Sequence, residues 1–329
     1  MENIYDLVIV GGGPAGVAAG IYAARKKMKT VLITDIFGGQ SLVSDDIQNW
    51  IGEPHISGFE LAQKFEKHLK AQEGIEIIED DLVAVIRTSD VLGTSDVPNF
   101  SVQTKNGKTF ETKTVLFTAG SRRKRLEVPG EKELEGKGVF FCATCDAPLM
   151  GGKIAAVVGG GNAGLEAVID LLPYASKIYL LHRRDELKGD TVTQEKIKTN
   201  PKVEIIYNAE TQKILGDKTV AGLEYKDNVS GEIKKISADG IFVEIGIVPN
   251  TDLVKDIVSL NLRGEVVTDS KTQATSCVGI WAAGDATDGL YRQNNISTGD
   301  AAKAVLNIYD YLKNQAMSDV AQNRKTSQS

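Results

Sequence analysis

The chain has 329 residues, a formal net charge of −6 and a charged fraction of 25%. This length suits two domains better than a single core, and the net negative charge argues against broad nucleic-acid binding. The sequence has no apolar stretch of membrane-spanning length and no basic-then-apolar signal segment at its N-terminus. Three cysteines, two of them close together, do not make the disulfide scaffold of a small secreted protein, so we expect a cytoplasmic protein.

The chain opens with a strand–helix–strand unit. We expect a strand over Asp6–Val10, a helix over Pro14–Arg25 and a strand over Thr30–Ile33. The loop before the helix reads G-x-G-x-x-G, in which glycines permit a tight turn, close approach of a pyrophosphate and close helix packing. This fingerprint predicts a dinucleotide site at the helix N-terminus. The candidate binding residues of this site are Gly11, Gly13, Pro14, Ala15 and Gly16.

Asp35 follows the second strand of this unit. A carboxylate near that position would accept hydrogen bonds from an unmodified ribose diol, although a solvated turn aspartate is the plain alternative. Further along, apolar residues on one face predict a helix over Phe59–Lys70. Residues 75–116 are expected to form short strands, with a turn at Asn106-Gly107.

A second unit repeats the spacing of the first. We expect a strand over Ile154–Val158, a helix over Ala163–Leu172 and a strand over Lys177–Leu181, with a second G-x-G-x-x-G loop before the helix. Two such loops in the same context favour two dinucleotide sites over glycine-rich turns of an unrelated α/β fold. The candidate binding residues in this loop are Gly159, Gly161, Asn162, Ala163 and Gly164.

The second unit ends in the basic run His182-Arg183-Arg184, with Lys188 four residues beyond Arg184. Arginine presents a bidentate fork that matches phosphate, so this cluster favours a ribose 2′-phosphate. It therefore predicts NADPH rather than NADH as the nucleotide. A solvated basic loop is the alternative interpretation.

Four further elements are expected after these units. They are a hairpin around Asp227–Glu232, strands over Gly240–Glu244 and Ile280–Ala283, and a helix from about Gly299 to Lys313. The polar tail from Asn314 onward is expected to be disordered.

The last strand and helix look like a return to the first unit. The predicted fold is therefore α/β, with two Rossmann-like dinucleotide-binding domains, the second inserted into the first. Residues 1–120 and 247–329 would form the first domain and residues 121–246 the second. The chain would cross between them near Gly120 and Gly246.

A Cys142-Ala143-Thr144-Cys145 motif precedes the second fingerprint. A zinc site would need two more ligands, and the remaining cysteine and histidines form no second pair at ligand spacing. A redox dithiol fits better, because this spacing at a helix start brings the sulfurs into bonding range and the helix dipole lowers a thiol pKa. Two dinucleotide sites and a dithiol suggest electrons passing from one nucleotide through another to a disulfide. The residues left for zinc are Cys277, His55, His68 and His182.

Asp146 follows the motif directly and could pass a proton to a leaving thiolate. It could equally be an acidic residue that the helix dipole stabilises. Cys277 is most simply a buried structural cysteine. A group of basic residues ahead of the dithiol could steer an acidic partner or form a solvated loop. These residues are Arg122, Arg123, Lys124, Arg125 and Lys137.

Taken together, these motifs resemble low-molecular-weight thioredoxin reductase, the bacterial and archaeal flavoenzyme type, from about Tyr5 to Tyr311. The placement of the dithiol ahead of the second fingerprint is especially specific. The resemblance implies FAD on the discontinuous domain, NADPH on the inserted domain, a thioredoxin or thioredoxin-like partner, and a homodimer. Besides the motifs above, it rests on Gly38-Gly39-Gln40, Asn49-Trp50-Ile51-Gly52, Thr118-Ala119-Gly120, Gly246 with Pro249-Asn250, Gly284-Asp285 and Arg292-Gln293.

The resemblance also implies roles for single residues. Cys145 would face the flavin and Cys142 would exchange with thioredoxin, while the inserted domain rotates so that nicotinamide and dithiol take turns beside the flavin. Arg183, Arg184 and Lys188 would hold the 2′-phosphate. Further cofactor contacts are implied for Gly38, Gly39, Gln40, Asn49, Thr118, Ala119, Gly120, Gly246, Gly284, Asp285, Arg292 and Gln293.

Three residues depart from the family pattern. Lys188 stands where arginine is usual, which keeps the charge but loses the planar fork. Ile296 and Ala301 stand where threonine and glycine are common near the flavin. Three alternatives therefore remain: a reductase fed by NADH or ferredoxin, one serving a different disulfide partner such as a peroxidase, and a nucleotide-sensing protein with a regulatory dithiol.

Overall fold

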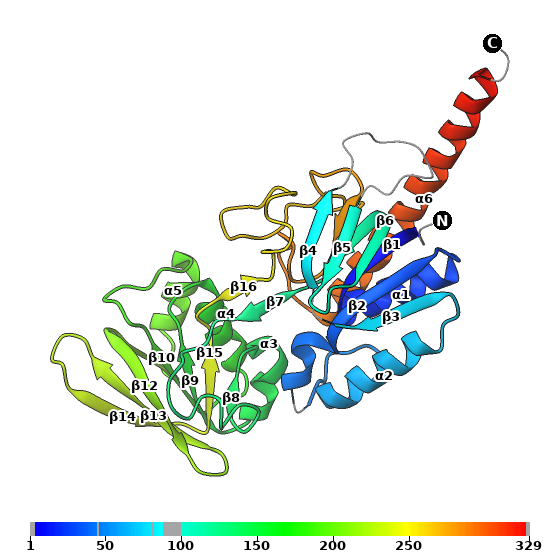
Figure 1. The fold of residues 1–329 in the computed structure, drawn as a ribbon. Helices are drawn as coiled ribbons and strands as arrows, with labels where there is room; N and C mark the ends of the chain where they lie inside the picture. The colour runs from blue at the N-terminus through cyan, green and yellow to red at the C-terminus, as the bar shows by residue number, and fades with distance from the viewer. Residues whose placement is uncertain (1–3, 45, 81, 88–99, 327–329) are drawn as a thin grey trace.

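The computed structural model describes residues 4–44, 46–80, 82–87 and 100–326 (Figure 1). A first sheet is built from the beginning and the end of the chain, in the order β3-β2-β1-β6-β5-β4, with β17 beside β6. Strands β1, β2, β3, β6 and β17 run parallel, whereas β4 and β5 are antiparallel additions. The strands are β1 (Tyr5–Gly12), β2 (Thr30–Phe37), β3 (Ile75–Glu79), β4 (Leu82–Arg87), β5 (Phe100–Thr104), β6 (Thr109–Phe117) and β17 (Ile280–Ala282).

Both faces of this sheet are covered, which explains its almost continuous apolar strands. Successive side chains of β1 alternate between the faces. Leu7 and Ile9 pack in the core formed with the helices, whereas Val8 and Val10 pack in the core on the opposite face. The helices are α1 (Pro14–Arg25), α2 (Gly58–Lys70) and α6 (Asn294–Thr326), and a 3₁₀ turn, η1 (Gly39–Val43), follows β2.

A second sheet is parallel throughout, in the order β11-β10-β9-β15-β8. The antiparallel sheet β12-β13-β14 packs on one of its faces and the helices on the other. Its strands are β8 (Val139–Phe140), β9 (Ile154–Val158), β10 (Lys177–Leu181), β11 (Val203–Ile206) and β15 (Gly240–Val243). The remaining elements are β12 (Ala209–Gly216), β13 (Val220–Asp227), β14 (Ile233–Ser237), α3 (Ala143–Asp146), η2 (Ala147–Met150), α4 (Asn162–Leu171) and α5 (Thr191–Lys198).

The chain passes between the first and second sheets along β7 (Ser121–Arg123) and β16 (Ile247–Pro249), which pair antiparallel (Figure 1). The carbonyl of Gly246 accepts a hydrogen bond from the Lys124 amide (3.0 Å) beside this pair. The passage lies where the sequence predicts the crossings, near Gly120 and Gly246. The exact division of the chain into domains stays a prediction.

Most expected elements are present, and several are longer than predicted. The α/β class, both strand–helix–strand units, the turn at Asn106-Gly107 and the hairpin between β13 and β14 are confirmed. Strand β2 continues past Ile33 to Phe37, whereas β15 and β17 each end one residue early. Helix α2 begins after Ser57, whose hydroxyl accepts from the Glu60 amide in a capping box.

The prediction for the C-terminus is wrong. Helix α6 begins at Asn294, before the expected Gly299, and continues to Thr326 through the stretch predicted to be disordered. Residues such as Gln315, Ala316 and Met317 have good helix propensity. Extending an existing helix needs no new nucleus, so a polar composition does not end it. No helix in the described part of the chain is both long and apolar enough to cross a bilayer.

Candidate functional site

The first fingerprint joins β1 to α1 in a loop that requires glycine at two of its positions. A Cβ added at Gly16 would lie 1.8 Å from the Gly11 carbonyl oxygen, and one added at Gly11, where φ is +108°, would lie 2.6 Å from that of Thr118. At Gly13, by contrast, no described atom lies within 4 Å of an added Cβ. Gly11 and Gly16 therefore serve packing, whereas Gly13 leaves bare backbone toward open space.

Gly13 is the N-cap of α1, and no described side chain caps the first turn of this helix. The amides of that turn thus have no local acceptor, an arrangement that suits a bound phosphate. The glycine turn after β2 lies close by, because the Gly38 amide donates to the Gly12 carbonyl (3.0 Å).

A cavity of about 850 Å³ opens above this loop, at the carboxyl ends of β1, β2 and β6. Its volume is typical of a ligand site, and its position is where parallel α/β sheets bind ligands. The open cavity, the uncapped helix and the bare Gly13 together fit a dinucleotide such as FAD. Predicted site residues that line it are Gly11, Gly13, Pro14, Ala15, Asp35, Gly39, Gln40, Thr118, Ala119, Gly120, Gly284 and Asp285.

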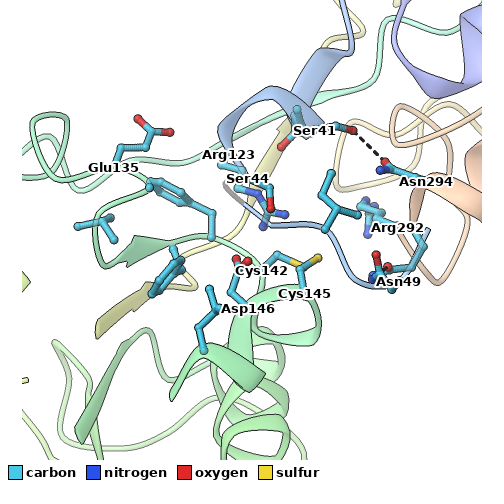
Figure 2. A pocket seen from close by; sticks show the side chains of 18 of the residues that line it. Ser41, Ser44, Asn49, Arg123, Glu135, Cys142, Cys145, Asp146, Arg292 and Asn294 are labelled. Atoms are coloured by element: carbon cyan, nitrogen blue, oxygen red, sulfur yellow. Dashed lines mark hydrogen bonds between the residues drawn. A yellow bond between two sulfur atoms is a disulfide. The ribbon is translucent and has the colours of Figure 1, made fainter. Parts of the chain in front are cut away.

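A smaller pocket of about 100 Å³ adjoins the cavity and contains the two cysteines (Figure 2). Gln40, Ser41, Asp285 and Asn294 line both spaces, so the two lie side by side. The pocket brings together residues that lie far apart in the sequence. Those predicted for the site are Gln40, Asn49, Cys142, Cys145, Asp146, Asp285, Arg292 and Gln293.

The side of the pocket that belongs to the first sheet is held by polar contacts. Asn49 Nδ2 donates to Gln293 Oε1 (3.0 Å). Arg292 forms an ion pair with the buried carboxylate of Glu265, and its Nε atom is buried without a hydrogen-bond partner among the described residues. An orphaned donor of this kind fits a polar cofactor group in the pocket.

The opposite side of the pocket is the disulfide itself. Cys142 and Cys145 are bonded, with their Cα atoms 5.3 Å apart. Cys142 is the N-cap of α3, and its carbonyl accepts from the amides of Cys145 (3.2 Å) and Asp146 (3.0 Å). The prediction of a dithiol at a helix start is therefore confirmed. Asp146 is buried, and Cys277 lies buried in the core of the first sheet.

Two charged residues near the disulfide were not predicted as pocket residues: Arg123, which the sequence suggested only for steering a partner, and Glu244, which it placed only at the end of a strand. Arg123, from β7, lines the pocket (Figure 2), and Glu244 follows β15 and accepts a hydrogen bond from the Ala143 amide (3.4 Å). Burial raises the pKa of Glu244 to about 7, although Arg123 acts in the opposite direction. Burial likewise raises the pKa of Asp285. A lone acidic residue at the carboxyl end of an apolar strand was the one sequence signal for Glu244.

The second fingerprint repeats the geometry of the first. A Cβ added at Gly164 would lie 1.8 Å from the Gly159 carbonyl oxygen, whereas at Gly161 no described atom lies within 4 Å. Gly161 is the N-cap of α4, which no described side chain caps. Asn162 Oδ1 accepts from the Asp190 amide (2.7 Å), and Ala163 lies in the first turn of α4.

The predicted basic cluster lies beside this loop. The Lys188 amide donates to the Gly160 carbonyl (2.7 Å), and the side chains of Arg183, Arg184 and Lys188 are exposed. His182 is buried against Gly160, and burial lowers its pKa. Three cations therefore stand free to meet an anion at the second loop, while His182 packs as a neutral ring.

Some predicted residues lie outside both spaces. Among the described residues that line the cavity and the pocket, none comes from the second fingerprint or the basic cluster, and Gly16, Gly38 and Gly246 are also absent. Of the two departures from the family pattern near the flavin, Ile296 is 39% exposed in the first turn of α6 and Ala301 is buried against the first sheet.

Comparisons with known proteins agree with this geometry. Residues 5–304 match the family model described as pyridine nucleotide-disulphide oxidoreductase. The chain is 40% identical over 308 residues to an NADH dehydrogenase of Bacillus subtilis (strain 168), and 40% identical over 312 residues to an alkyl hydroperoxide reductase protein of Escherichia coli (strain K12). Each alignment covers 94% of this chain, but only 58% and 59% of those relatives, so the chain spans little more than half of their length.

A solved structure covers the whole architecture. Thioredoxin reductase from Streptococcus pyogenes MGAS5005 superposes with a TM-score of 0.87 at 32% identity, over 95% of this chain and 100% of that one. The chain therefore belongs to the pyridine nucleotide-disulphide oxidoreductases and, within them, is thioredoxin reductase-like, a flavoprotein type with a redox-active disulfide.

Proposed function

We propose that this chain is an NADPH-dependent, FAD-containing disulfide reductase that delivers electrons through Cys142 and Cys145 to a thioredoxin-like protein. The observation that carries the proposal is the position of the disulfide, in a pocket that shares four lining residues with the large cavity over the first fingerprint: Gln40, Ser41, Asp285 and Asn294. A disulfide that served only to stabilise the fold would have no need of such a neighbour.

The chain offers places for the pyrophosphate and for a ribose of the proposed FAD. Amides in the first turn of α1 would hold the pyrophosphate, and Asp35 at the cavity edge would accept from a ribose diol. Asp285 and Gln40 line both this cavity and the disulfide pocket. When bound there, FAD supplies the chemistry that accepts a hydride from a nicotinamide and hands an electron pair to a disulfide.

The dithiol then exchanges with the partner protein. Once the pair is reduced, Cys142 as thiolate attacks the partner disulfide, forming a mixed disulfide and releasing one partner thiolate. Cys145 attacks the Cys142 sulfur, which restores the Cys142–Cys145 bond and releases the second partner sulfur. Asp146, adjacent to Cys145 and buried beside it, is proposed to protonate a leaving thiolate.

The first test is Cys142→Ser. This variant is expected to lose reduction of thioredoxin to the background rate, because the attacking sulfur is gone, while NADPH still bleaches the flavin absorbance. Cys277→Ser is the matched control and is expected to keep the activity, since Cys277 lies buried in the core of the first sheet. Retained thioredoxin reduction by Cys142→Ser, or a colourless protein that cannot be reconstituted with FAD, would refute the assignment.

The proposed donor rests on the exposed cations Arg183, Arg184 and Lys188 beside the second loop. A second candidate is an NADH-fed reductase serving a peroxidase, which the 40% identity to the Bacillus subtilis and Escherichia coli proteins favours. Anaerobic stopped-flow reduction of the flavin by NADPH, NADH and reduced ferredoxin separates the donors. Steady-state assays with a thioredoxin and with a peroxidase separate the partners, and light scattering tests the proposed homodimer.

A further inference from the structure

Glu244 joins the second nucleotide loop to the disulfide. Its amide donates to the Val158 carbonyl (2.9 Å), and its own carbonyl oxygen would lie 2.2 Å from a Cβ added at Gly159, so its backbone is fixed against the fingerprint. Its side chain reaches the other way, where Oε1 accepts from the Ala143 amide (3.4 Å). The carboxylate is thus held at the backbone of the residue that directly follows Cys142.

Charged groups of both signs face Glu244 from three elements. Arg123 from β7 is the cation, without a direct ion pair to Glu244, and Asp146 from α3 and Asp170 from α4 are the anions. The Asp170 carboxylate lies at the exposed end of this group and accepts a hydrogen bond from the Thr144 hydroxyl (2.8 Å). Burial is the largest influence on Glu244 and outweighs the cation and the Ala143 amide, which is why its pKa rises to about 7.

Reduction of the disulfide changes the charge beside this carboxyl. A closed disulfide is neutral, whereas a reduced pair with one acidic thiol carries a negative charge at pH values where that thiol is ionised. A new negative charge next to a carboxyl favours its protonated form. The two groups then titrate as a coupled pair rather than singly.

We propose that Glu244 is a positioning residue whose protonation is coupled to the redox state of Cys142–Cys145: above neutral pH it is ionised beside the closed disulfide and takes up a proton when the sulfurs are reduced. The inference rests on the proposed function for the source of electrons. The sulfur–sulfur bond breaks as two electrons enter from the reduced flavin. One sulfur takes a proton and becomes a thiol, the other remains a thiolate, and Glu244 takes the second proton from water.

This role is distinct from the one proposed for Asp146. Asp146 would move a proton to a leaving thiolate during exchange, whereas Glu244 would hold a proton for as long as the pair stays reduced. The stored proton offsets the new negative charge in a pocket that already contains the carboxyls of Asp146 and Asp285. A thiolate, the attacking form of cysteine, can then persist there.

The test is the pH dependence of the disulfide potential in the holoenzyme. Each proton taken up with the two electrons changes the equilibrium constant tenfold per pH unit, which is about 30 mV for this couple. Above pH 7 the wild-type slope is expected to exceed that of Glu244→Gln by this amount. Below about pH 6 the slopes should coincide, because a carboxyl with a pKa of about 7 is already protonated.

The potential is measured by equilibration with dithiothreitol buffers and mass-spectrometric counting of alkylated thiols in the peptide that carries both cysteines. Glutamine keeps an oxygen for the Ala143 amide, and Asp170→Asn is the matched control, expected to keep the wild-type slope. Equal slopes for wild type and Glu244→Gln above pH 7 would overturn the proposal. Because the buffer supplies the electrons, this result does not depend on the flavin or the partner, so failure of the proposed function is seen separately.

A second measurement is infrared spectroscopy, and its first result comes from the wild-type protein alone. In reduced-minus-oxidised infrared spectra of the wild-type holoenzyme at pH 8, a carbonyl band of a newly protonated carboxylic acid is expected. Its absence would also overturn the proposal. The band is expected to persist in Asp170→Asn and to vanish in Glu244→Gln.

Discussion

Two glycines of the first fingerprint should fail in different ways when replaced by alanine. At Gly16 the added Cβ would lie 1.8 Å from the Gly11 carbonyl oxygen, about 1.6 Å short of the 3.4 Å at which ordinary contact begins. The obstacle is backbone, which cannot rotate away, so the loop between β1 and α1 must open. At Gly13 the same methyl group meets no described atom within 4 Å.

The cost of Gly16→Ala follows from these distances. Overpacking typically costs about 1–3 kcal/mol, and a rigid backbone obstacle places this case near 3. Gly16 lies inside α1, so alanine regains about 1 kcal/mol of helix propensity. The net loss of about 2 kcal/mol should lower the melting temperature of the flavin-free protein by roughly 3 °C, because the unfolding entropy of a 329-residue chain is about 0.7 kcal/mol/K.

Gly13→Ala should not lower the stability of the flavin-free protein. The residue has φ of −71° and ψ of −174°, which alanine adopts without strain, and a less flexible unfolded chain gives about 0.4–1 kcal/mol of stabilisation. The loss appears in binding, because the methyl group projects where the pyrophosphate is proposed to lie. A steric cost of about 1–3 kcal/mol to FAD binding raises the dissociation constant of FAD roughly 5- to 150-fold.

Thermal melts of flavin-free protein and FAD titrations followed by flavin fluorescence measure both effects on the same samples. The expected result is a crossed pattern, with Gly16→Ala less stable and Gly13→Ala stable but poor in flavin. If Gly16→Ala melted at the same temperature as the wild type, the close approach of helix and loop would not limit the stability of the protein. If Gly13→Ala bound FAD as tightly as the wild type, the cavity above it would not be the phosphate site.

Two further predictions concern the donor and the core. Arg184→Ala should lower kcat/KM for NADPH about 10- to 100-fold, the range for lost hydrogen bonds to a charged group, with little change for NADH. Lys188→Arg should increase the preference for NADPH over NADH. Equal losses with both nucleotides in Arg184→Ala would place the 2′-phosphate elsewhere. Phe242 is fully buried, with its ring centroid 5.1 Å from that of Phe140, so Phe242→Ala should cost about 3–5 kcal/mol in urea unfolding. The exposed control Val229→Ala should stay within about 0.5 kcal/mol of the wild type.

The sequence predicted features that local chemistry decides. The fingerprint loops depend on glycines within six residues, and the dithiol depends on Cys142 at the start of a short helix. Helix α1 begins and ends as predicted, since Pro14 and the turn after Arg25 are local signals. The C-terminal end of α6 was predicted less well. Helix α6 continues well past Lys313 because polar composition alone does not stop a helix that has already formed.

The remaining parts of the site depend on contacts between distant segments. Asn49 meets Gln293 across 244 positions of sequence, and Glu244 meets Ala143 across 101. Neither pair has a spacing that a sequence pattern can display. The resemblance marked Asn49 and Gln293 as cofactor residues without indicating their contact. Glu244 was assigned only to the end of a strand, since an acidic side chain shows its burial, and hence its raised pKa, only in the folded chain.

The arrangement of the first and second sheets bears on the order of steps in the proposed reaction. The disulfide occupies the pocket beside the large cavity, while the described residues lining that pocket include none from the second fingerprint. If a nucleotide held at that fingerprint delivers its hydride into the space that the disulfide occupies, as the proposed function requires, hydride delivery and disulfide reduction need two arrangements of the chain. Two steps that compete for one space must alternate, and β7 and β16 carry the chain between the sheets. The resemblance implies a rotation of the inserted domain, and this pair of strands is where it would have to bend.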